Sequence, residues 1–158
     1  MDNRQHDVHM LEAIRLSEEG VLHGGGPFGA VVVKDGKIVG KGYNQVTLAN
    51  DPTAHAEVTA IRDAAKTLGT FDLSGCTIYT SCEPCPMCLG AIYWARLGKV
   101  FYGNNKIDAA RIGFDDKFIY EELDRPIAQR AVPMVRLMPE KSARAFEMWG
   151  DKADRKEY

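Results

Sequence analysis

The sequence predicts an α/β fold in one domain over residues 1–158, a three-layer α/β/α sandwich around one mixed sheet of about five strands. Three observations carry this prediction. The 158 residues, 45% of them hydrophobic, are enough for one self-supporting core. An Asp-Gly pair separates two runs rich in strand-forming residues. After it, strand-like and helix-like segments alternate.

The N-terminal part is predicted to form a helix followed by a hairpin. Apolar residues recur at mostly helical spacing over residues 7–23, and the Gly-Gly-Gly-Pro sequence that follows ends this helix. Residues 28–34 and 37–43 have the composition of strands. Asp35 and Gly36 between them favour a type I′ turn, because that turn needs positive φ at both central positions.

The rest of the chain alternates between helices and strands. A helix is expected over about residues 54–68, a strand over 76–80, a helix over 85–95 and a strand over 100–102. This alternation implies parallel pairing with right-handed crossovers, and the preceding hairpin makes the sheet mixed. The elements expected after residue 103 are short helices near 107–112 and 118–123, a strand at 132–137 and a last helix at 140–149.

Charge and composition exclude several classes of protein. The 20 Lys and Arg residues against 22 Asp and Glu give a net charge of −2, which offers no general attraction to nucleic acid or acidic membranes. The polar start lacks a signal-peptide core, and no apolar run approaches the roughly 20 residues of a membrane span. Three of the four cysteines lie within residues 82–88, which suits metal or thiol chemistry in a reducing compartment. We therefore expect a cytoplasmic protein without a nucleic-acid or membrane partner.

His55, Cys85 and Cys88 have the spacing of a zinc site. Two cysteines at i and i+3 in the first turn of a helix lie about 5–6 Å apart at Cβ and point the same way, and the helix N-terminus stabilises their thiolates. His55 begins the other helix, so the three side chains are expected to meet between two helix N-termini. Three protein ligands leave a fourth position for water, which zinc ionises at about pH 7.

Glu57, two residues after His55, could exchange protons with that water and with a substrate nitrogen. In an alternative interpretation, Cys82 completes a closed Cys₃His site, Glu57 is idle, and the protein is a zinc-stabilised binding module. A second alternative is a pair of core cysteines without metal. The other histidines lack partners at ligand spacing and are expected at the surface: His6, His9 and His23.

His-x-Glu at residues 55–57, followed by Pro-Cys-x-x-Cys at 84–88, is the signature of zinc-dependent nucleobase deaminases. Further blocks extend the likeness over essentially the whole chain: Gly-Pro-Phe-Gly-Ala at 26–30, Asn-Asp-Pro-Thr at 50–53, Ser-Cys-Glu at 81–83, Gly-Phe-Asp-Asp at 113–116 and the terminal Lys-Glu-Tyr. With these blocks the chain resembles the bacterial guanine deaminases, which have the cytidine-deaminase-like fold.

The resemblance implies roles for individual positions. His55, Cys85 and Cys88 would hold one Zn²⁺ ion, and Glu57 would move protons. The residues implied to contact a purine base are Phe28, Asn44, Ala56 through its backbone N–H, Trp94, Asp116 and Tyr158. The resemblance also implies a homodimer in which the segment of about residues 139–158 is exchanged between subunits. Tyr158 would then act in the pocket of the other subunit.

The implied reaction is hydrolytic deamination of guanine at C2, giving xanthine and ammonia, in purine salvage or catabolism. A tRNA adenosine deaminase, a guanosine deaminase, a cytosine deaminase and an aminohydrolase of amino-substituted triazines are alternatives. A tRNA enzyme needs a basic surface near its pocket, whereas residues 139–158 carry five basic and five acidic side chains. The Gly-Phe-Asp-Asp block and the terminal tyrosine favour a purine over cytosine.

Overall fold

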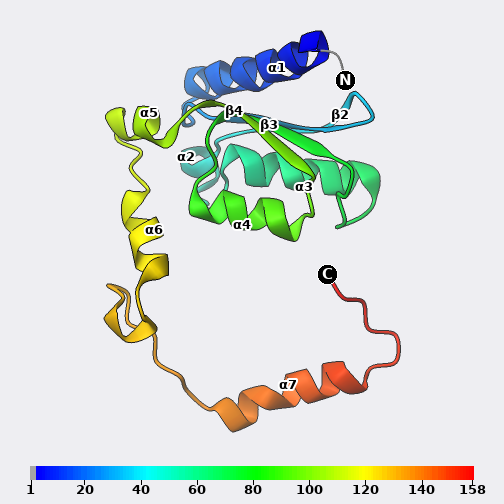
Figure 1. Cartoon of the computed structure of the whole chain (residues 1–158), viewed down its shortest axis with the longest axis vertical. Helices are drawn as coiled ribbons and strands as arrows, with labels where there is room; N and C mark the ends of the chain where they lie inside the picture. Colours follow the sequence, from blue (N-terminus) through cyan, green and yellow to red (C-terminus); the bar gives the residue numbers. More distant parts are fainter. Residues whose placement is uncertain (1–2) are drawn as a thin grey trace. The chain divides into compact units, whose positions relative to one another are not determined.

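A four-stranded mixed sheet lies at the centre of the first part of the chain (Figure 1). The computed structural model describes residues 3–158, and the chain divides after Asp116 into two compact units. The strands are β1 (Gly29–Lys34), β2 (Lys37–Tyr43), β3 (Thr77–Cys82) and β4 (Lys99–Asn104), in the order β2-β1-β3-β4. β1 pairs antiparallel with β2 and β3, and β3 pairs parallel with β4. The predicted α/β class and mixed pairing are confirmed, with four strands instead of five.

The helices follow the predicted order. They are α1 (Asn3–Leu22), α2 (Val46–Ala49), α3 (Ala56–Leu68), α4 (Pro86–Trp94), α5 (Lys106–Arg111), α6 (Lys117–Asp124), the 3₁₀ helix η1 (Ile127–Gln129) and α7 (Pro139–Asp151). Only the short elements α2 and η1 had no counterpart in the prediction. Over residues 3–158, none of these helices combines the length and apolar character that a membrane crossing requires.

The turn between β1 and β2 has the geometry that its two residues predict. Asp35 has φ of 49° and Gly36 has φ of 76°, so both central positions are in the left-handed region. The pairing of the two strands shifts register once, between Val32 and Val33. The predicted antiparallel hairpin is confirmed.

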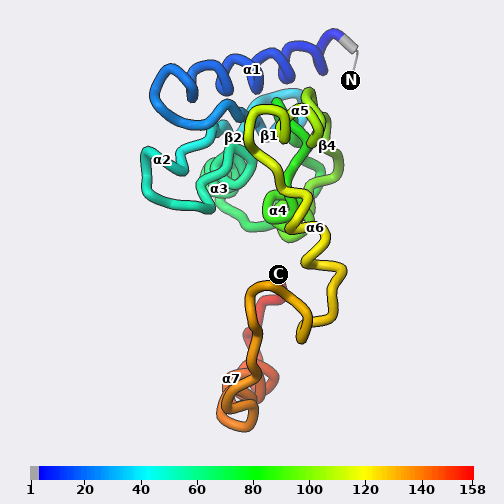
Figure 2. The backbone as a smooth tube through the Cα atoms, turned by 90° about the vertical axis from the view of Figure 1, so that its left-hand side faces the viewer, coloured from blue at the N-terminus to red at the C-terminus, as the bar shows by residue number. Residues whose placement is uncertain are grey.

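One face of the sheet is covered by α3 and α4, which lie side by side (Figure 2). α3 approaches β2 very closely. A Cβ atom at Gly42 would lie 2.5 Å from the carbonyl oxygen of Ala56, and one at Gly40 would lie 2.4 Å from that of Ala60. Only glycine permits this contact between a helix backbone and a strand. The packing therefore fixes the N-terminal end of α3 against β2.

The opposite face of the sheet is covered by α1 (Figure 1). Ala13 and Leu16 of this helix form a buried cluster with Val31 and Val33 of β1 and with Tyr79 of β3. Because helices cover both faces, the central strands are buried on both sides. This explains why β1 and β3 have nearly continuous apolar or buried sequences instead of an alternating pattern.

His9 corrects one expectation, because it is buried and not at the surface. It is 6% exposed, and its ring centroid lies 5.2 Å from that of Tyr79. Within the described residues, neither ring nitrogen has a hydrogen-bond partner. The helical period places His9 on the same face of α1 as the buried Ala13 and Leu16, whereas metal-ligand spacing carries no information about burial. Its neighbour His6 is also held, with Nδ1 2.6 Å from the Tyr79 hydroxyl oxygen.

The second unit, residues 117–158, contains α6, η1 and α7, and none of its residues is buried. The strand expected at residues 132–137 does not form, so the prediction of a fifth strand is wrong. A strand needs the hydrogen bonds of a neighbour, and Pro133 removes one backbone donor. Large apolar side chains are exposed along this unit, among them Phe118, Val135, Leu137 and Phe146. The unit therefore has no core of its own.

Candidate active site

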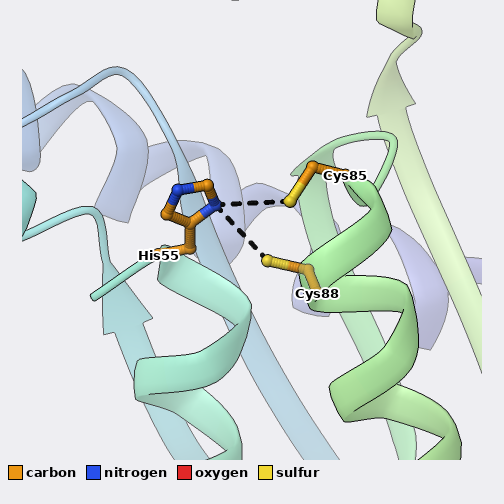
Figure 3. Close-up of side chains that lie close together, drawn as sticks. All are labelled: His55, Cys85 and Cys88. Atoms are coloured by element: carbon orange, nitrogen blue, oxygen red, sulfur yellow. Dashed lines mark hydrogen bonds between the residues drawn. The ribbon is translucent and has the colours of Figure 1, made fainter. Parts of the chain in front are cut away.

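His55, Cys85 and Cys88 come together between the N-terminal ends of α3 and α4 (Figure 3). His55 is the N-cap residue of α3, Cys85 is the N-cap residue of α4, and Cys88 lies in the first turn of α4. Because β2 and β3 both run antiparallel to β1, they point the same way. Helices α3 and α4, which come after β2 and β3, therefore begin at the same end of the strands. The predicted meeting of two helix N-termini is confirmed.

The three candidate ligand atoms have the geometry of a tetrahedral zinc site. The sulfur atoms of Cys85 and Cys88 each lie 3.5 Å from Nδ1 of His55, and all three atoms lie within 4.8 Å of one another. Zn–S bonds of about 2.3 Å and Zn–N bonds of about 2.05 Å at the tetrahedral angle place nitrogen and sulfur about 3.5 Å apart. One imidazole and two thiols are also the kind of donors that zinc selects. These residues could therefore hold the ion together.

The cluster shifts the pKa values of its two thiols in opposite directions. A hydrogen bond with Cys88 and one with His55 lower the pKa of Cys85 to about 4, although burial opposes the shift. The pKa of Cys88 is raised by the hydrogen bond with Cys85 and by burial. The hydrogen bond with Cys85 also raises the pKa of His55. The lowered pKa favours the thiolate form of Cys85, which is the form that binds metals.

The carboxyl group of Glu57 lies beside the cluster, almost completely buried. Glu57 is 6% exposed, and its Oε2 lies 3.4 Å from the sulfur of Cys88. Its Oε1 accepts a hydrogen bond from the hydroxyl group of Thr80 at 3.3 Å. Burial raises the pKa of Glu57, because the charged form loses its hydration. A buried carboxyl group with a raised pKa holds a proton more readily than an exposed one, which suits a general acid and base.

Cys82 does not belong to the ligand cluster. Its sulfur donates a hydrogen bond to the carbonyl oxygen of Asn105 at 3.8 Å, and the cluster found among residues 3–158 contains only the histidine and the other two cysteines. Burial and the charge of Glu57 raise the pKa of Cys82 to about 11, which keeps the thiol protonated. The closed Cys₃His alternative is therefore wrong. Three protein ligands with an open position are typical of catalytic zinc.

Two of the residues implied to contact the base, Phe28 and Asn44, lie next to each other at the open end of the hairpin. The backbone N–H of Asn44 donates to the carbonyl oxygen of Phe28 at 2.9 Å, and its buried side chain accepts from the N–H of Val46 at 3.2 Å. A Cβ atom at Gly26 would lie only 3.0 Å from Cγ of Asn44. The ring of Phe28 meets Phe114 edge-to-face at 4.9 Å. Both side chains are thus held by their surroundings.

Ala56 and Asp116 are also placed near the cluster. Ala56 is fully buried and is the first residue of α3, where a backbone N–H has no acceptor within the helix. Burial, and after it the charge of Cys85, raises the pKa of Asp116, which puts its carboxyl group within electrostatic reach of the site. Either group could face a bound molecule.

Trp94 and Tyr158 are not brought to the cluster within the first unit. Trp94 is the last residue of α4, about 12 Å along the helix from its first residue, and it is 68% exposed. Tyr158 belongs to the second unit. Contact of these two side chains with a base stays a prediction.

The sequence analysis gave no role to Thr80 or to Phe114, which contact Glu57 and Phe28 respectively. A signal existed for Thr80, since it is a polar residue at an inward position of a predicted buried strand. Phe114 lies in the Gly-Phe-Asp-Asp block that supports the resemblance, but nothing in its spacing points to an aromatic contact.

Comparisons with known proteins agree with this geometry. Residues 3–104 match the family described as the cytidine and deoxycytidylate deaminase zinc-binding region. The chain is 54% identical to the guanine deaminase of Bacillus subtilis (strain 168) over 154 residues, which are 97% of this chain and 99% of that protein. The X-ray structure of guanine deaminase from Bacillus subtilis matches with a TM-score of 0.93 at 55% identity, covering 97% of this chain and 98% of that chain. The tRNA-specific adenosine deaminase of Bacillus subtilis (strain 168) is 40% identical over 99 residues, which are 63% of this chain and 62% of that protein.

The matched region contains the histidine, the two cysteines and Glu57. The description of the family and the donor set of the cluster agree on the metal, so zinc is the cofactor. The chain therefore belongs to the family of cytidine and deoxycytidylate deaminase zinc-binding domains.

Proposed function

We propose that this protein is a zinc-dependent guanine deaminase, which converts guanine and water into xanthine and ammonia. The observation that carries the proposal is the buried Glu57 carboxyl group beside a His-Cys-Cys cluster, a ligand set typical of catalytic zinc. Identity of 54% to a guanine deaminase along nearly the whole chain supports guanine as the substrate. A tRNA-specific relative matches only 63% of the chain.

In this proposal His55, Cys85 and Cys88 hold the zinc ion. When bound, zinc lowers the pKa of a coordinated water so that a nucleophile is available at neutral pH. Glu57 accepts a proton from the attacking water through Oε2 and donates it to ring nitrogen N3 as the new C–O bond forms at C2. Glu57 then transfers the second proton to the amino group, which leaves as ammonia while the C2 carbonyl forms. Protons and bonds balance, and the carboxylate returns to its starting state.

The base would be held by groups on both sides of the cluster. The side-chain amide of Asn44 and the backbone N–H of Ala56 would hydrogen-bond the polar edge of the purine. The ring of Phe28 would pack against its face, since flat apolar surfaces favour such stacking. We propose further contacts through Trp94, Asp116 and Tyr158.

The sharpest test replaces the proposed acid and base. Glu57→Gln keeps the shape and can still accept the hydrogen bond from Thr80, but it cannot carry a proton. We expect ammonia release from guanine to fall at least about 100-fold with zinc content unchanged. Glu18→Gln, the same change at an exposed position of α1, should match the wild type. Near-normal turnover by the Glu57 variant would contradict the proposal.

The substrate is tested by measuring ammonia release from guanine, guanosine, cytosine, adenine and the triazine ammeline. We expect guanine to be the preferred substrate. Salt-sensitive binding of tRNA in a gel-shift assay, together with absent activity on free guanine, would favour a tRNA adenosine deaminase instead.

Removal of the metal distinguishes an enzyme from a zinc-stabilised module. The buried clusters on both faces of the sheet do not include the three metal ligands, so the chelated protein should stay folded and lose activity. Unfolding on chelation, followed by far-ultraviolet circular dichroism, would instead indicate a structural zinc.

We also propose that residues 1–158 form one deaminase domain of a homodimer, with about residues 139–158 exchanged between subunits. Residues 117–158 bury none of their side chains, and ordering a segment without burying apolar surface is unfavourable. A second copy of the chain would cover these side chains. The free thiols of all four cysteines suit the reducing cytoplasm, where we expect the protein to act.

Complementation tests the exchange directly. A dimer of one Glu57→Gln chain and one Tyr158→Ala chain has one fully intact site if the tail is swapped, and none if it is not. Refolding the two inactive variants together should therefore restore about a quarter of wild-type activity, because half of the dimers are mixed. No recovery, or a monomeric mass by light scattering, would contradict the exchange.

A further inference from the structure

Thr80 is a hydroxyl-bearing residue in the middle of a buried strand face. It lies in β3 opposite Ala30 of β1 and Tyr102 of β4, and it is completely buried. Ile78, two residues earlier, belongs to the apolar cluster that packs against α3 and α4. A buried hydroxyl group needs an acceptor, and the acceptor of Thr80 is Oε1 of Glu57 at 3.3 Å.

The two oxygens of the Glu57 carboxyl group therefore have different neighbours. Oε1 is bound by Thr80 on the sheet, whereas Oε2 lies 3.4 Å from the sulfur of Cys88, a proposed zinc ligand. A glutamate reaches its position through three torsions, and the last of them is broad and roughly two-fold. A partner on each oxygen fixes the plane of the carboxyl group more closely than a partner on Oε2 alone.

We propose that Thr80 is a positioning residue that holds Oε1 of Glu57 so that Oε2 faces the reacting atoms. The inference rests on the proposed function, because it assigns Thr80 a part in that reaction. Because the hydroxyl group of Thr80 is bound to Glu57, we expect Thr80 to act on the proton transfers and not on binding. Displacement of a reacting group by about 1 Å can slow a reaction about 100-fold, which makes such an anchor consequential.

Threonine suits this role better than the two side chains most similar to it in size, valine and serine. Valine has the same shape but no donor, so it would remove the hydroxyl partner of the buried Oε1. Serine keeps the donor but loses the methyl group that restricts χ1. The two substitutions therefore separate the hydroxyl group from the shape of the side chain.

The first experiment compares these variants in ammonia release from guanine. We expect Thr80→Val to lower kcat about 10- to 100-fold with KM changed less than about threefold, at unchanged zinc content. Thr80→Ser should recover most of the lost kcat. The matched control is Thr77→Val, the same change in the same strand at a position of opposite parity, where we expect wild-type kinetics.

A double-mutant cycle separates positioning from a general structural effect. If Thr80 acts through the carboxylate, Thr80→Val should cause no further loss of residual activity in the Glu57→Gln background. An equal fold-loss in both backgrounds would mean that Thr80 supports the fold and not Glu57, and would overturn the inference. A kcat of Thr80→Val equal to the wild type, or a loss confined to KM, would also overturn it.

Failure of the inference is distinct from failure of the proposed function. A wild-type protein that releases ammonia from guanine while Thr80→Val does so equally well refutes the role of Thr80 alone. If the wild type acts on another base, the same variants are assayed with that base and the same criteria apply. A wild type that deaminates no base refutes the proposed function, and the role of Thr80 with it.

Discussion

The two faces of the sheet pack against their helices in partly different ways. On the α3 side, glycines of β2 meet alanines of the helix, so backbone packs directly against backbone. On the α1 side, one glycine of β1 also meets the helix backbone, since a Cβ atom at Gly29 would lie 2.2 Å from the carbonyl oxygen of Ala13. Large rings fill the rest of this side: Tyr79 stacks on Phe101 with centroids 5.0 Å apart, and His9, whose ring nitrogens have no partner among the described residues, packs against Tyr79. The α3 side therefore has two close glycine contacts along one helix, whereas the α1 side has one and is otherwise filled by side chains.

This difference suggests that the α3 side positions the site, whereas the α1 side contributes mainly to stability. The side that carries His55 and Glu57 needs accurate placement, and small residues leave the helix little freedom to shift. The α1 side tolerates an unsatisfied polar group, because no chemistry depends on it. Substitutions on the α3 side should therefore change metal binding and turnover, and those on the α1 side should change stability alone.

The largest effect is expected at the metal ligands. Cys88→Ala removes one of three ligands, so zinc content measured by atomic absorption should fall well below one per chain, and activity should be lost. Cys82→Ala, at a cysteine outside the ligand cluster, should keep stoichiometric zinc. Equal loss of metal in both variants would support the alternative of a closed site with four protein ligands.

The second largest effect is expected for a substitution at the contact between α3 and β2. Gly42→Ala places a methyl group 2.5 Å from the Ala56 carbonyl oxygen, so the helix must move. We expect a loss of about 3 kcal/mol in the free energy of unfolding, measured with urea, and weaker zinc binding. Gly90→Ala, where a Cβ meets no atom within 4 Å, should not destabilise the protein. A Gly42 variant with wild-type stability and zinc affinity would contradict the rigid α3 side.

On the α1 side, His9→Leu should stabilise the protein while leaving kcat and KM unchanged. It removes two unpartnered ring nitrogens, which should raise the free energy of unfolding by about 1 kcal/mol at pH 7. The exposed His23 carries the control substitution, His23→Leu, which should change stability by less than about 0.5 kcal/mol.

The advantage of His9→Leu should grow on acidification. Burial, and then the charge of His6, lowers the pKa of His9 below its ordinary value of 6.5. Below pH 6.5 the unfolded chain therefore binds a proton that the folded chain resists, and wild-type stability falls until the folded pKa is reached. Urea titrations at pH 7 and pH 5.5 measure the difference, and a constant gap between the two proteins would show that His9 does not contribute to it.

The smallest effect is expected at Glu12 of α1, which bridges Arg15 at 2.8 Å and Lys41 of β2 at 2.7 Å. Hydrogen bonds with Arg15 and then Lys41 lower the pKa of Glu12 from 4.5 to about 2. Glu12→Gln should cost about 0.5 kcal/mol above pH 4.5, since the partners are largely exposed.

The sign of the effect follows from the lowered pKa. Protonation of the folded protein lags behind that of the unfolded chain, so the contribution of Glu12 disappears as the pH falls from 4.5 towards 2. Chemical denaturation at several pH values measures this window against Glu18→Gln. A difference that persists at pH 2 would exclude the ion pairs as its cause.

The hairpin turn and the candidate metal ligands were predictable from the sequence. The Asp35-Gly36 turn formed with both φ angles positive, because few other dipeptides adopt them. The ligands were predictable because two cysteines in one helical turn and a histidine at another helix start leave few geometries. What the spacing could not supply was the fate of Cys82, which depends on the path of the chain after β3.

Features that depend on long-range contacts were missed. The run at residues 132–137 has the apolar composition of a strand, but a strand exists only beside a partner. The prediction of a surface position for His9 is wrong, because its spacing from Ala13 and Leu16 puts it on the buried face of α1. Thr80 and Glu57 are 23 residues apart in the chain, and they come into contact only when α3 packs on the sheet.

The placement of the three ligands on two separate helix starts has a consequence for the timing of assembly. His55 and the cysteine pair lie 30 residues apart and meet only when α3 and α4 have both docked on the sheet. A nascent or refolding chain therefore acquires its complete coordination late, after tertiary contacts are made. Uptake of a spectroscopically visible ion such as Co²⁺ during refolding would then report docking of the two helices and not their formation.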